Sequence, residues 1–87
     1  MASYRIEWKQ SARKELRRLQ KQDIARVLTT VEKLADEPRP AGCRKLAGSA
    51  DHYRVRIGDI RVIYAVMDGR LVVQIVRVAQ RGSVYKR

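Results

Sequence analysis

The stretch that most constrains the fold runs from residue 53 to residue 64 and reads Tyr-Arg-Val-Arg-Ile-Gly-Asp-Ile-Arg-Val-Ile-Tyr. Apolar and charged side chains alternate on both sides of Gly58 and Asp59, which predicts a β-hairpin closed by a two-residue turn. Because strand side chains point alternately to the two faces of a sheet, one face should be apolar and the other basic. The apolar face should carry Val55, Ile57, Ile60, Val62 and Tyr64, and the opposite face Arg54, Arg56 and Arg61.

A two-residue turn also determines which residues of the hairpin lie opposite each other. Counting outward from the turn pairs Ile57 with Ile60, Arg56 with Arg61, Val55 with Val62 and Arg54 with Ile63. Like charges directly opposite each other destabilise a sheet. A folded protein that keeps Arg56 opposite Arg61 is therefore expected to bind an anion there.

The preceding half of the chain predicts one strand and two helices. Residues 4–8 alternate apolar and polar side chains, as a strand does. Ser11 and Asp23 are expected to cap the two helices, and Pro38 and Pro40 to end the second. Their apolar positions, which recur at helical spacing, are Ala12, Leu16 and Leu19, then Ile24, Val27, Leu28, Val31, Leu34 and Ala35.

The following half predicts more strands. Lys45 and Leu46 are expected to begin a short strand, and residues 67–70, Met-Asp-Gly-Arg, a second hairpin turn suited to type I′. Continuing the register along residues 71–78 pairs Val66 with Leu71, Tyr64 with Val73, Ile63 with Gln74, Val62 with Ile75 and Arg61 with Val76. We therefore predict an α+β fold of order β-α-α-β-β-β, with a two-helix hairpin packed on one face of an antiparallel sheet and the arginines on the other.

Length and composition indicate one domain, residues 1–87. No apolar run approaches the ~18 residues of a membrane span, and the N-terminus has no signal-like region. Cys43 is the only cysteine, which excludes an internal disulfide and suits a reducing compartment. We expect a cytoplasmic protein without a membrane partner.

The net charge of +11 is spread over the chain: residues 1–50 carry 12 basic and 6 acidic side chains, and residues 51–87 carry 8 and 3. The excess is therefore not a basic tail. A domain this basic attracts polyanions such as nucleic acid or an acidic protein. The alternative is that the charge serves only solubility, although its self-repulsion costs stability.

Five residues are candidates for chemistry on a phosphate: Arg54, Arg56, Arg61, Arg81 and Tyr85. Arginine offers a planar set of donors suited to phosphate, and tyrosine can stack on a base. The alternative is that the arginines are only solvent-exposed residues of the sheet and that Tyr85 only packs against the fold. His52, the only histidine, is expected in a loop rather than as a base, and no metal-ligand or Gly-rich phosphate motif is present. We expect no metal and no cofactor.

The chain resembles the RelE/ParE superfamily of bacterial toxin–antitoxin toxins over almost its whole length. The resemblance rests on residues 12–19, 34–38 and 45–48, and most specifically on the hairpin of residues 53–64 and the ending of residues 81–85. It implies a RelE-like fold and an acidic antitoxin partner, with DNA bound only indirectly through the toxin–antitoxin complex.

The RelE branch, by this resemblance, cuts mRNA in the A site of the small ribosomal subunit. The 2′-hydroxyl attacks the adjacent phosphate without metal and leaves a 2′,3′-cyclic phosphate. The family's basic site positions correspond to Arg54, Arg56, Arg61 and Arg81, and its C-terminal tyrosine to Tyr85. The resemblance implies that the first three hold the phosphate, that Arg81 stabilises the leaving oxygen or helps to protonate it, and that Tyr85 stacks on or orients the RNA. The ParE branch instead poisons DNA gyrase and generally lacks the full set.

This chain departs from the best-known RelE toxins at the positions that concern the general base. The best-known RelE toxins carry lysine at the positions of Arg54 and Arg56, and one of those lysines is the proposed base. Arginine does not readily give up a proton. Either orientation and charge stabilisation suffice, or the ribosome supplies a group. A non-enzymatic RNA-binding module is a further alternative to both toxin activities.

Overall fold

The structure is a computed structural model and describes residues 3–80. Its elements are β1 (Arg5–Trp8), α1 (Gln10–Arg17), α2 (Lys21–Leu34), β2 (Arg44–Lys45), β3 (His52–Ile57), β4 (Ile60–Met67) and β5 (Val72–Gln80). The five strands form one sheet in the order β1-β5-β4-β3-β2. The predicted α+β class is confirmed, and the order of elements is as predicted except that four strands, not three, follow the helices. The sheet is mixed rather than wholly antiparallel, because β1 lies parallel to β5.

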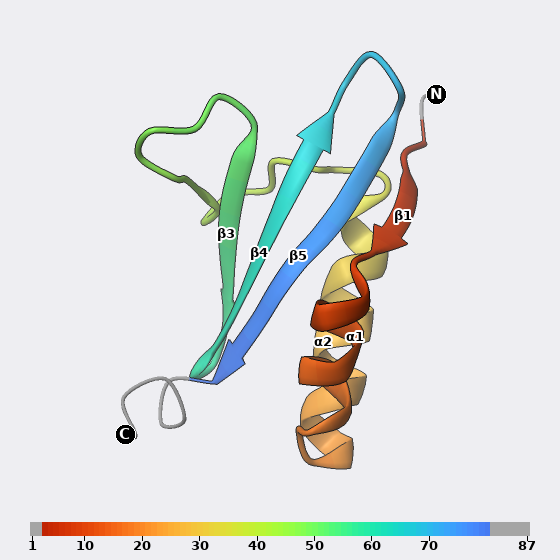
Figure 1. Cartoon of the computed structure of the whole chain (residues 1–87), viewed down its shortest axis with the longest axis vertical. Helices are drawn as coiled ribbons and strands as arrows, with labels where there is room; N and C mark the ends of the chain where they lie inside the picture. Colours follow the sequence, from red (N-terminus) through yellow and green to blue (C-terminus); the bar gives the residue numbers. More distant parts are fainter. Residues whose placement is uncertain (1–2, 81–87) are drawn as a thin grey trace.

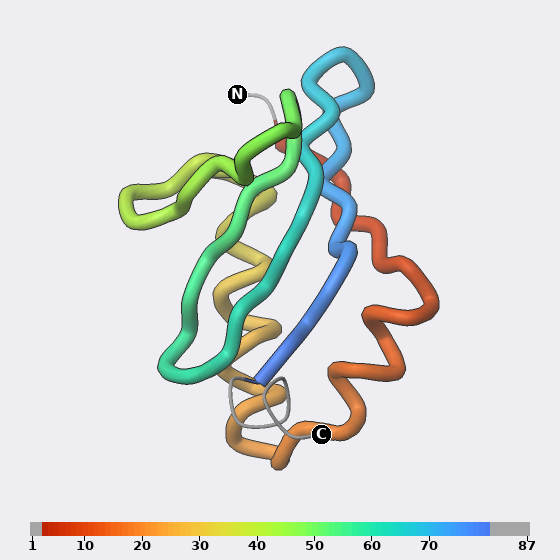
Figure 2. Tube along the Cα trace, turned by 60° about the vertical axis from the view of Figure 1, so that its left-hand side comes forward, coloured from red at the N-terminus to blue at the C-terminus, as the bar shows by residue number. Residues whose placement is uncertain are grey.

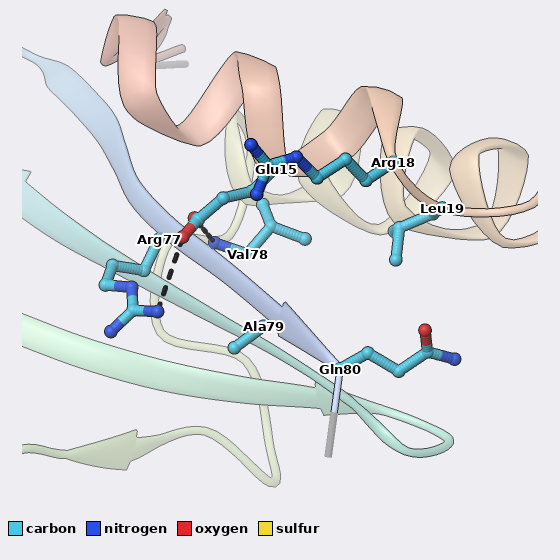
Figure 3. A pocket seen from close by; sticks show the side chains of 7 residues that line it. All are labelled: Glu15, Arg18, Leu19, Arg77, Val78, Ala79 and Gln80. Carbon is cyan, nitrogen blue, oxygen red and sulfur yellow. Dashed lines mark hydrogen bonds and ion pairs between the residues drawn. The ribbon is translucent and has the colours of Figure 1, made fainter. Parts of the chain in front are cut away.

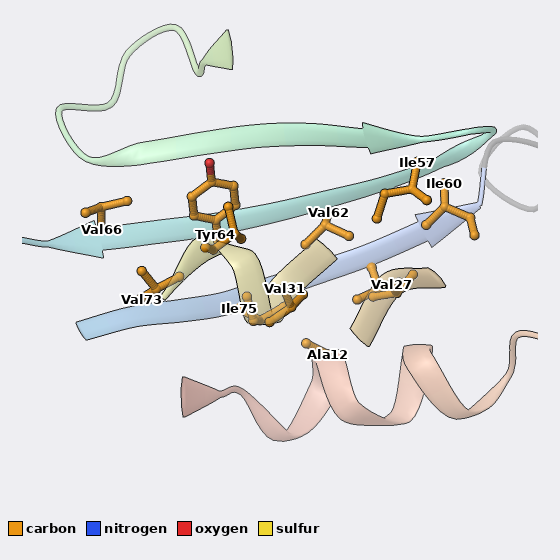
Figure 4. Close-up of a cluster of buried hydrophobic side chains, with 12 residues drawn as sticks. Ala12, Val27, Val31, Ile57, Ile60, Val62, Tyr64, Val66, Val73 and Ile75 are labelled. Carbon is orange, nitrogen blue, oxygen red and sulfur yellow. The ribbon is translucent and has the colours of Figure 1, made fainter. Parts of the chain in front are cut away.

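Both helices lie on the same side of the sheet, as predicted (Figure 1). Their buried side chains meet the apolar face of the hairpin in one core (Figure 4). The cluster comprises Ala12, Val27, Val31, Leu34, Ile57, Ile60, Val62, Tyr64, Val66, Val73, Ile75 and Val78. Neither helix within residues 3–80 is long and apolar enough to cross a membrane.

The helix boundaries differ from the prediction at their starts. The N-cap positions are Lys9 and Gln20, so Ser11 and Asp23 lie inside the first turns and neither caps its helix. Asp23 still contributes in the first turn of α2, where a carboxylate opposes the positive end of the helix dipole. Leu28, predicted on the apolar side of α2, is 40% exposed.

The first hairpin has the predicted register in full. Ile57 pairs with Ile60, Arg56 with Arg61, Val55 with Val62 and Arg54 with Ile63. Gly58 has a φ of +62°, the left-handed conformation that glycine adopts without a steric penalty. A Cβ at Gly58 would also lie 2.9 Å from a guanidinium nitrogen of Arg26, which packs against the turn from α2.

The second hairpin was predicted wrongly. Its loop contains the four residues 68–71, so Met67 pairs with Val72, Val66 with Val73, Ala65 with Gln74 and Tyr64 with Ile75. Leu71 belongs to this loop, with a φ of 54°, and is 43% exposed instead of buried. Because the register moves by two residues, Val73 and Ile75 keep their predicted face and lie in the core.

A β-bulge in β5 then moves the register by one more residue. Tyr64 pairs with Ile75 but Ile63 pairs with Arg77, which leaves Val76 as the extra residue. A one-residue step exchanges the two faces of a strand. The bulge therefore brings Val78 into the core and turns Arg77 toward the face that carries the hairpin arginines.

The segment between α2 and β3 projects beyond the β3 side of the sheet (Figure 2). Within it, β2 comprises only Arg44 and Lys45, one residue earlier than the predicted short strand, and pairs with β3. The face opposite the helices carries no helix of the described chain, and we call it the open face.

Candidate anion-binding site

Three of the five predicted site residues lie on the open face. Arg54 and Arg56 are two residues apart on β3, and Arg61 lies on β4 directly opposite Arg56. The predicted partner of Arg61 on β5 was Val76, but the bulge places the small residue Ala79 there. Arg56 is exposed, whereas Arg54 and Arg61 are half-buried.

These arginines form no ion pair in the described part of the chain. Within residues 3–80, no side-chain hydrogen bond or ion pair is made by Arg54, Arg56 or Arg61. In contrast, Arg39 and Arg77 each bind a carboxylate. Unpaired like charges side by side cost folding energy, so the arrangement is one that an anionic ligand would relieve.

The turn of the hairpin forms a shallow cavity beside two of the arginines. The cavity has a volume of about 160 Å³ and is lined by Arg56, Gly58, Asp59 and Arg61. Asp59 accepts a hydrogen bond of 3.2 Å from the side-chain amide of Gln80, the last residue of β5. The cavity thus offers two guanidinium groups to an anion the size of a phosphate.

Two further arginines share the open face and were missed by the sequence analysis. Arg44 of β2 is the cross-strand partner of Arg54, and Arg77 of β5 is the partner of Ile63. Cross-strand partners point to the same face, so Arg44, Arg54 and Arg77 form a row across the sheet. The bulge that turns Arg77 was not predicted, and β2 was expected one residue later.

Arg77 differs from the other members of this row because α1 holds it. Glu15 accepts a hydrogen bond of 3.3 Å from Arg77 and one of 2.7 Å from the backbone N–H of Val78 (Figure 3). The second bond satisfies an amide on the edge of β5 that β1 does not reach. These residues line a cavity of about 310 Å³ between α1 and β5. Glu15 therefore secures both the edge strand and the orientation of Arg77.

His52 also lies on the open face. It was predicted as a loop residue, but it is the first residue of β3, with Ala65 as its cross-strand partner. Its Nδ1 lies 2.9 Å from Asp51 Oδ1 and 2.9 Å from Ser49 Oγ. The two remaining predicted residues, Arg81 and Tyr85, lie outside the described residues.

A second polar cluster lies at the other end of the hairpin and is fully paired. Arg39 donates to Asp68 Oδ2 at 2.7 Å and to the Tyr53 hydroxyl at 2.9 Å, and the Tyr4 hydroxyl donates to Asp68 Oδ1 at 2.6 Å. The Arg39 guanidinium also lies over the Tyr53 ring, 5.2 Å from its centroid. These contacts join the start of β1, the segment after α2, β3 and the β4–β5 loop.

The electrostatics of this cluster follow from those contacts. Hydrogen bonds from Arg39 and then from Tyr4 hold the pKa of Asp68 below its ordinary value. The pKa of Tyr4 is raised, chiefly by its hydrogen bond to Asp68. Burial raises the pKa of Tyr64, whose hydroxyl donates to the carbonyl of Pro38 at 2.7 Å. The raised pKa values of Tyr4 and Tyr64 keep both hydroxyls protonated at neutral pH, which indicates a structural role.

Comparison with known proteins identifies the family. Residues 6–85 match the model of a family described as the ParE toxin of type II toxin-antitoxin system, parDE. The chain belongs to the RelE/ParE superfamily of type II toxins. The RelE1 protein of Methanocaldococcus jannaschii is 31% identical over 87 residues, which cover 95% of this chain and 96% of that one.

Solved structures of RelE proteins share the fold. A chain of the toxin–antitoxin complex RelBE2 from Mycobacterium tuberculosis matches with a TM-score of 0.83 and 28% identity, covering 93% of this chain and 94% of that chain. A chain of the RelE–RelB complex from Pyrococcus horikoshii OT3 gives 0.82 and 35%, covering 92% and 97%. The E. coli RelBE complex gives 0.80 and 25%, covering 90% and 96%. The predicted RelE-like fold is confirmed.

Proposed function

We propose that this RelE/ParE toxin is a ribosome-dependent endoribonuclease that cuts mRNA in the A site and so inhibits translation. The observation that carries the proposal is the pair Arg56 and Arg61, which lie directly opposite each other beside the turn cavity and form no ion pair within residues 3–80. Guanidinium groups fixed around a phosphate stabilise the charge that develops as the phosphate is attacked. No rearrangement of the sheet is needed to present them.

The proposed reaction needs no metal. The 2′-hydroxyl attacks the adjacent phosphorus, the bond to the 5′-oxygen breaks, and a 2′,3′-cyclic phosphate remains. Arg54, Arg56 and Arg61 hold the phosphate. Arg81, the residue after Gln80 in the sequence, is proposed to stabilise the leaving oxygen, and Tyr85 to stack on or orient the RNA.

A second candidate function is inhibition of DNA gyrase without nuclease activity. The matching family model is described by the ParE name, which favours this candidate. The full set of Arg54, Arg56, Arg61, Arg81 and Tyr85 favours the RelE activity, as do the RelE names of the related structures. Simple RNA binding without cleavage is the third outcome to be separated.

One experiment separates the three activities. The 5′ ends of an mRNA are mapped after incubation with the protein, with and without ribosomes, and gyrase supercoiling is assayed in parallel. We expect new 5′ ends only when ribosomes are present, and unchanged supercoiling. Loss of supercoiling without new 5′ ends would transfer the assignment to gyrase, and RNA retention with neither effect would leave a binding module.

We further propose an acidic antitoxin as the natural partner. The RelE proteins of Pyrococcus horikoshii and E. coli were each solved in complex with a RelB antitoxin. The net charge of +11 favours an acidic segment that folds as it covers this surface. Co-expression with the neighbouring reading frame should abolish toxicity, and the neutralising protein should be acidic. A basic or absent neutralising protein would contradict the proposal.

A further inference from the structure

We propose that His52 is the general base of the cleavage reaction, with Asp51 as its positioning residue. The inference rests on the proposed nuclease function and names the general base, for which that function has so far assigned no residue. The arginines of the open face cannot accept a proton, because a guanidinium stays protonated in proteins. Within residues 3–80, the proton acceptors beside Arg54, Arg56 and Arg61 are the imidazole of His52 and the carboxylate of Asp59, whereas the carboxylate of Glu15 is bound to Arg77.

The position of His52 relative to the arginines follows from the strand. His52, Arg54 and Arg56 are alternate residues of β3, so their side chains point to the same face. Neighbours of this kind are about 6.6 Å apart along a strand. The cross-strand partner of His52 is Ala65, a small residue that is buried at 4% exposure. His52 is one such step from Arg54 and two steps, about 13 Å, from Arg56 at the turn cavity, so the proposed base acts on a phosphate that Arg54 holds between them.

The hydrogen bonds of Nδ1 determine which nitrogen of the ring can accept a proton. Asp51 Oδ1 lies 2.9 Å from Nδ1 and can only accept, so Nδ1 carries the hydrogen of the neutral ring. Ser49 Oγ also lies 2.9 Å from Nδ1. It accepts hydrogen bonds from the backbone N–H groups of Asp51 and His52, at 3.4 and 3.1 Å. The free lone pair is then on Nε2. The His52 side chain is 37% exposed, so a substrate can reach it.

The backbone around this pair is fixed on both sides. The N–H of Leu46 donates to the carbonyl of His52 at 2.9 Å, and the N–H of Val66 donates to the carbonyl of Asp51 at 2.9 Å. Asp51 and His52 are thus bound to β4 and to the segment after β2. A base held in this way needs little reorganisation before the reaction.

The proton balance of the step is complete. Nε2 of neutral His52 takes the proton of the 2′-hydroxyl while the 2′-oxygen forms its bond to phosphorus. The bond from phosphorus to the 5′-oxygen breaks, and the 5′-oxygen takes a proton from water. The imidazolium formed is stabilised by the Asp51 carboxylate and later returns its proton to solvent. No oxidant, metal or further reactant is required.

The test measures single-turnover cleavage of ribosome-bound mRNA between about pH 5 and about pH 8, where an imidazole ordinarily titrates. Wild-type protein should show a rate that rises with pH and then levels off. His52→Asn keeps an amide that can bond to Asp51 but removes the acceptor Nε2. It should cleave at least ~100-fold more slowly and lose the inflection. His52→Gln provides a second variant, and both are compared after thermal melts that confirm folding.

Asp51→Asn examines the positioning role. Without its carboxylate the ring loses the group that orients it, so the plateau rate should fall by less than in His52→Asn while the dependence of the rate on pH is kept. The charged neighbours that also act on the ring, Arg54 on β3 and Arg44 on β2, are left unchanged. Asp36→Asn is the matched control, since Asp36 is an exposed carboxylate after α2 with no side-chain contact in the described chain.

The outcomes separate this inference from the function on which it rests. If wild-type protein leaves ribosome-bound mRNA intact, the nuclease function and the base are overturned together. If wild-type protein cleaves and Arg61→Ala does not, but His52→Asn and His52→Gln keep both rate and inflection, only the base is overturned. Asp59→Asn completes the test, because loss of the inflection in that variant alone would transfer the role to Asp59.

Discussion

The two ends of the β3–β4 hairpin use arginine in opposite ways. At the turn end, Arg56 and Arg61 face each other and neither forms an ion pair within residues 3–80. At the loop end, Arg39 binds Asp68 and the Tyr53 hydroxyl. A paired arginine contributes to folding, whereas two unpaired ones side by side oppose it. The comparison indicates that the loop end serves stability and the turn end serves a ligand.

The largest effect should come from removing charge at the turn end. Arg61→Ala and Arg81→Ala should each reduce cleavage of ribosome-bound mRNA by about 100-fold or more, because each removes a donor from the phosphate in the transition state. Arg54→Lys and Arg56→Lys should be tolerated, since a cation remains. The measurement is the single-turnover rate beside a thermal melt of each variant.

Arg70→Ala is the matched control for this experiment. Arg70 is exposed in the β4–β5 loop, and within residues 3–80 the one hydrogen bond of its side chain goes to the sulfur of Met67, at 3.8 Å. The Arg70→Ala substitution removes the same charge far from the turn and should leave cleavage unchanged. A wild-type cleavage rate in an Arg61→Ala, Arg81→Ala double variant would remove the nuclease assignment. If Arg70→Ala lost as much cleavage as Arg61→Ala, the effect of the turn-end arginines would be one of general charge.

The next effect should appear at the loop end, in stability and not in activity. Arg39→Ala removes an ion pair, a hydrogen bond to Tyr53 and a cation–π contact. The pair is partly exposed, so we expect a loss of about 1 kcal/mol and a fall in Tm of about 5 °C. Cleavage by the folded protein should not change. A loss of cleavage without a fall in Tm would contradict the division between the two ends.

A smaller effect should appear in the pH dependence of stability. Arg39 and Tyr4 hold the pKa of Asp68 below its ordinary value in the folded state. The stabilisation is therefore present at pH values above the ordinary pKa of an aspartate. It is lost as the pH falls from that value through the lower pKa that Asp68 has in the folded protein. Asp68→Asn should melt below wild type at neutral pH, and the two should converge in acid. A constant difference down to about pH 2 would refute this linkage.

The two hairpins show how much of the fold the sequence predicted. The first was predicted residue by residue, because its alternation is unbroken up to the two turn residues Gly58 and Asp59. The second had an equally suggestive Asp68-Gly69, but its loop is longer. Contacts from distant residues hold it: the N–H of Arg5 donates to Leu71 and the Tyr4 hydroxyl to Asp68. Local turn chemistry cannot reveal such contacts.

The bulge did leave a signal in the sequence. Gln74 and Arg77 are three residues apart, and so are the core residues Ile75 and Val78. In a regular strand, residues three apart point to opposite faces, so one extra residue between them restores the pattern. Reading this spacing would have placed Arg77 on the open face. The partnership of His52 with Asp51 depends on the loop conformation and had no comparable signal.

The smallest expected effect is a rise in Tm at the turn end, opposite in sign to the fall in Tm expected at the loop end. Arg56→Thr removes the repulsion between Arg56 and Arg61 and places a β-branched residue on a strand. Tm should therefore rise by about 2 °C while cleavage falls, whereas Arg39→Ala lowers Tm and spares cleavage. Thermal melts at low and high salt provide the check, because screening weakens the repulsion and should shrink the gain. A fall in Tm that does not depend on salt would mean that Arg56 supports the fold through its packing, and the turn end would lose its distinction from the loop end.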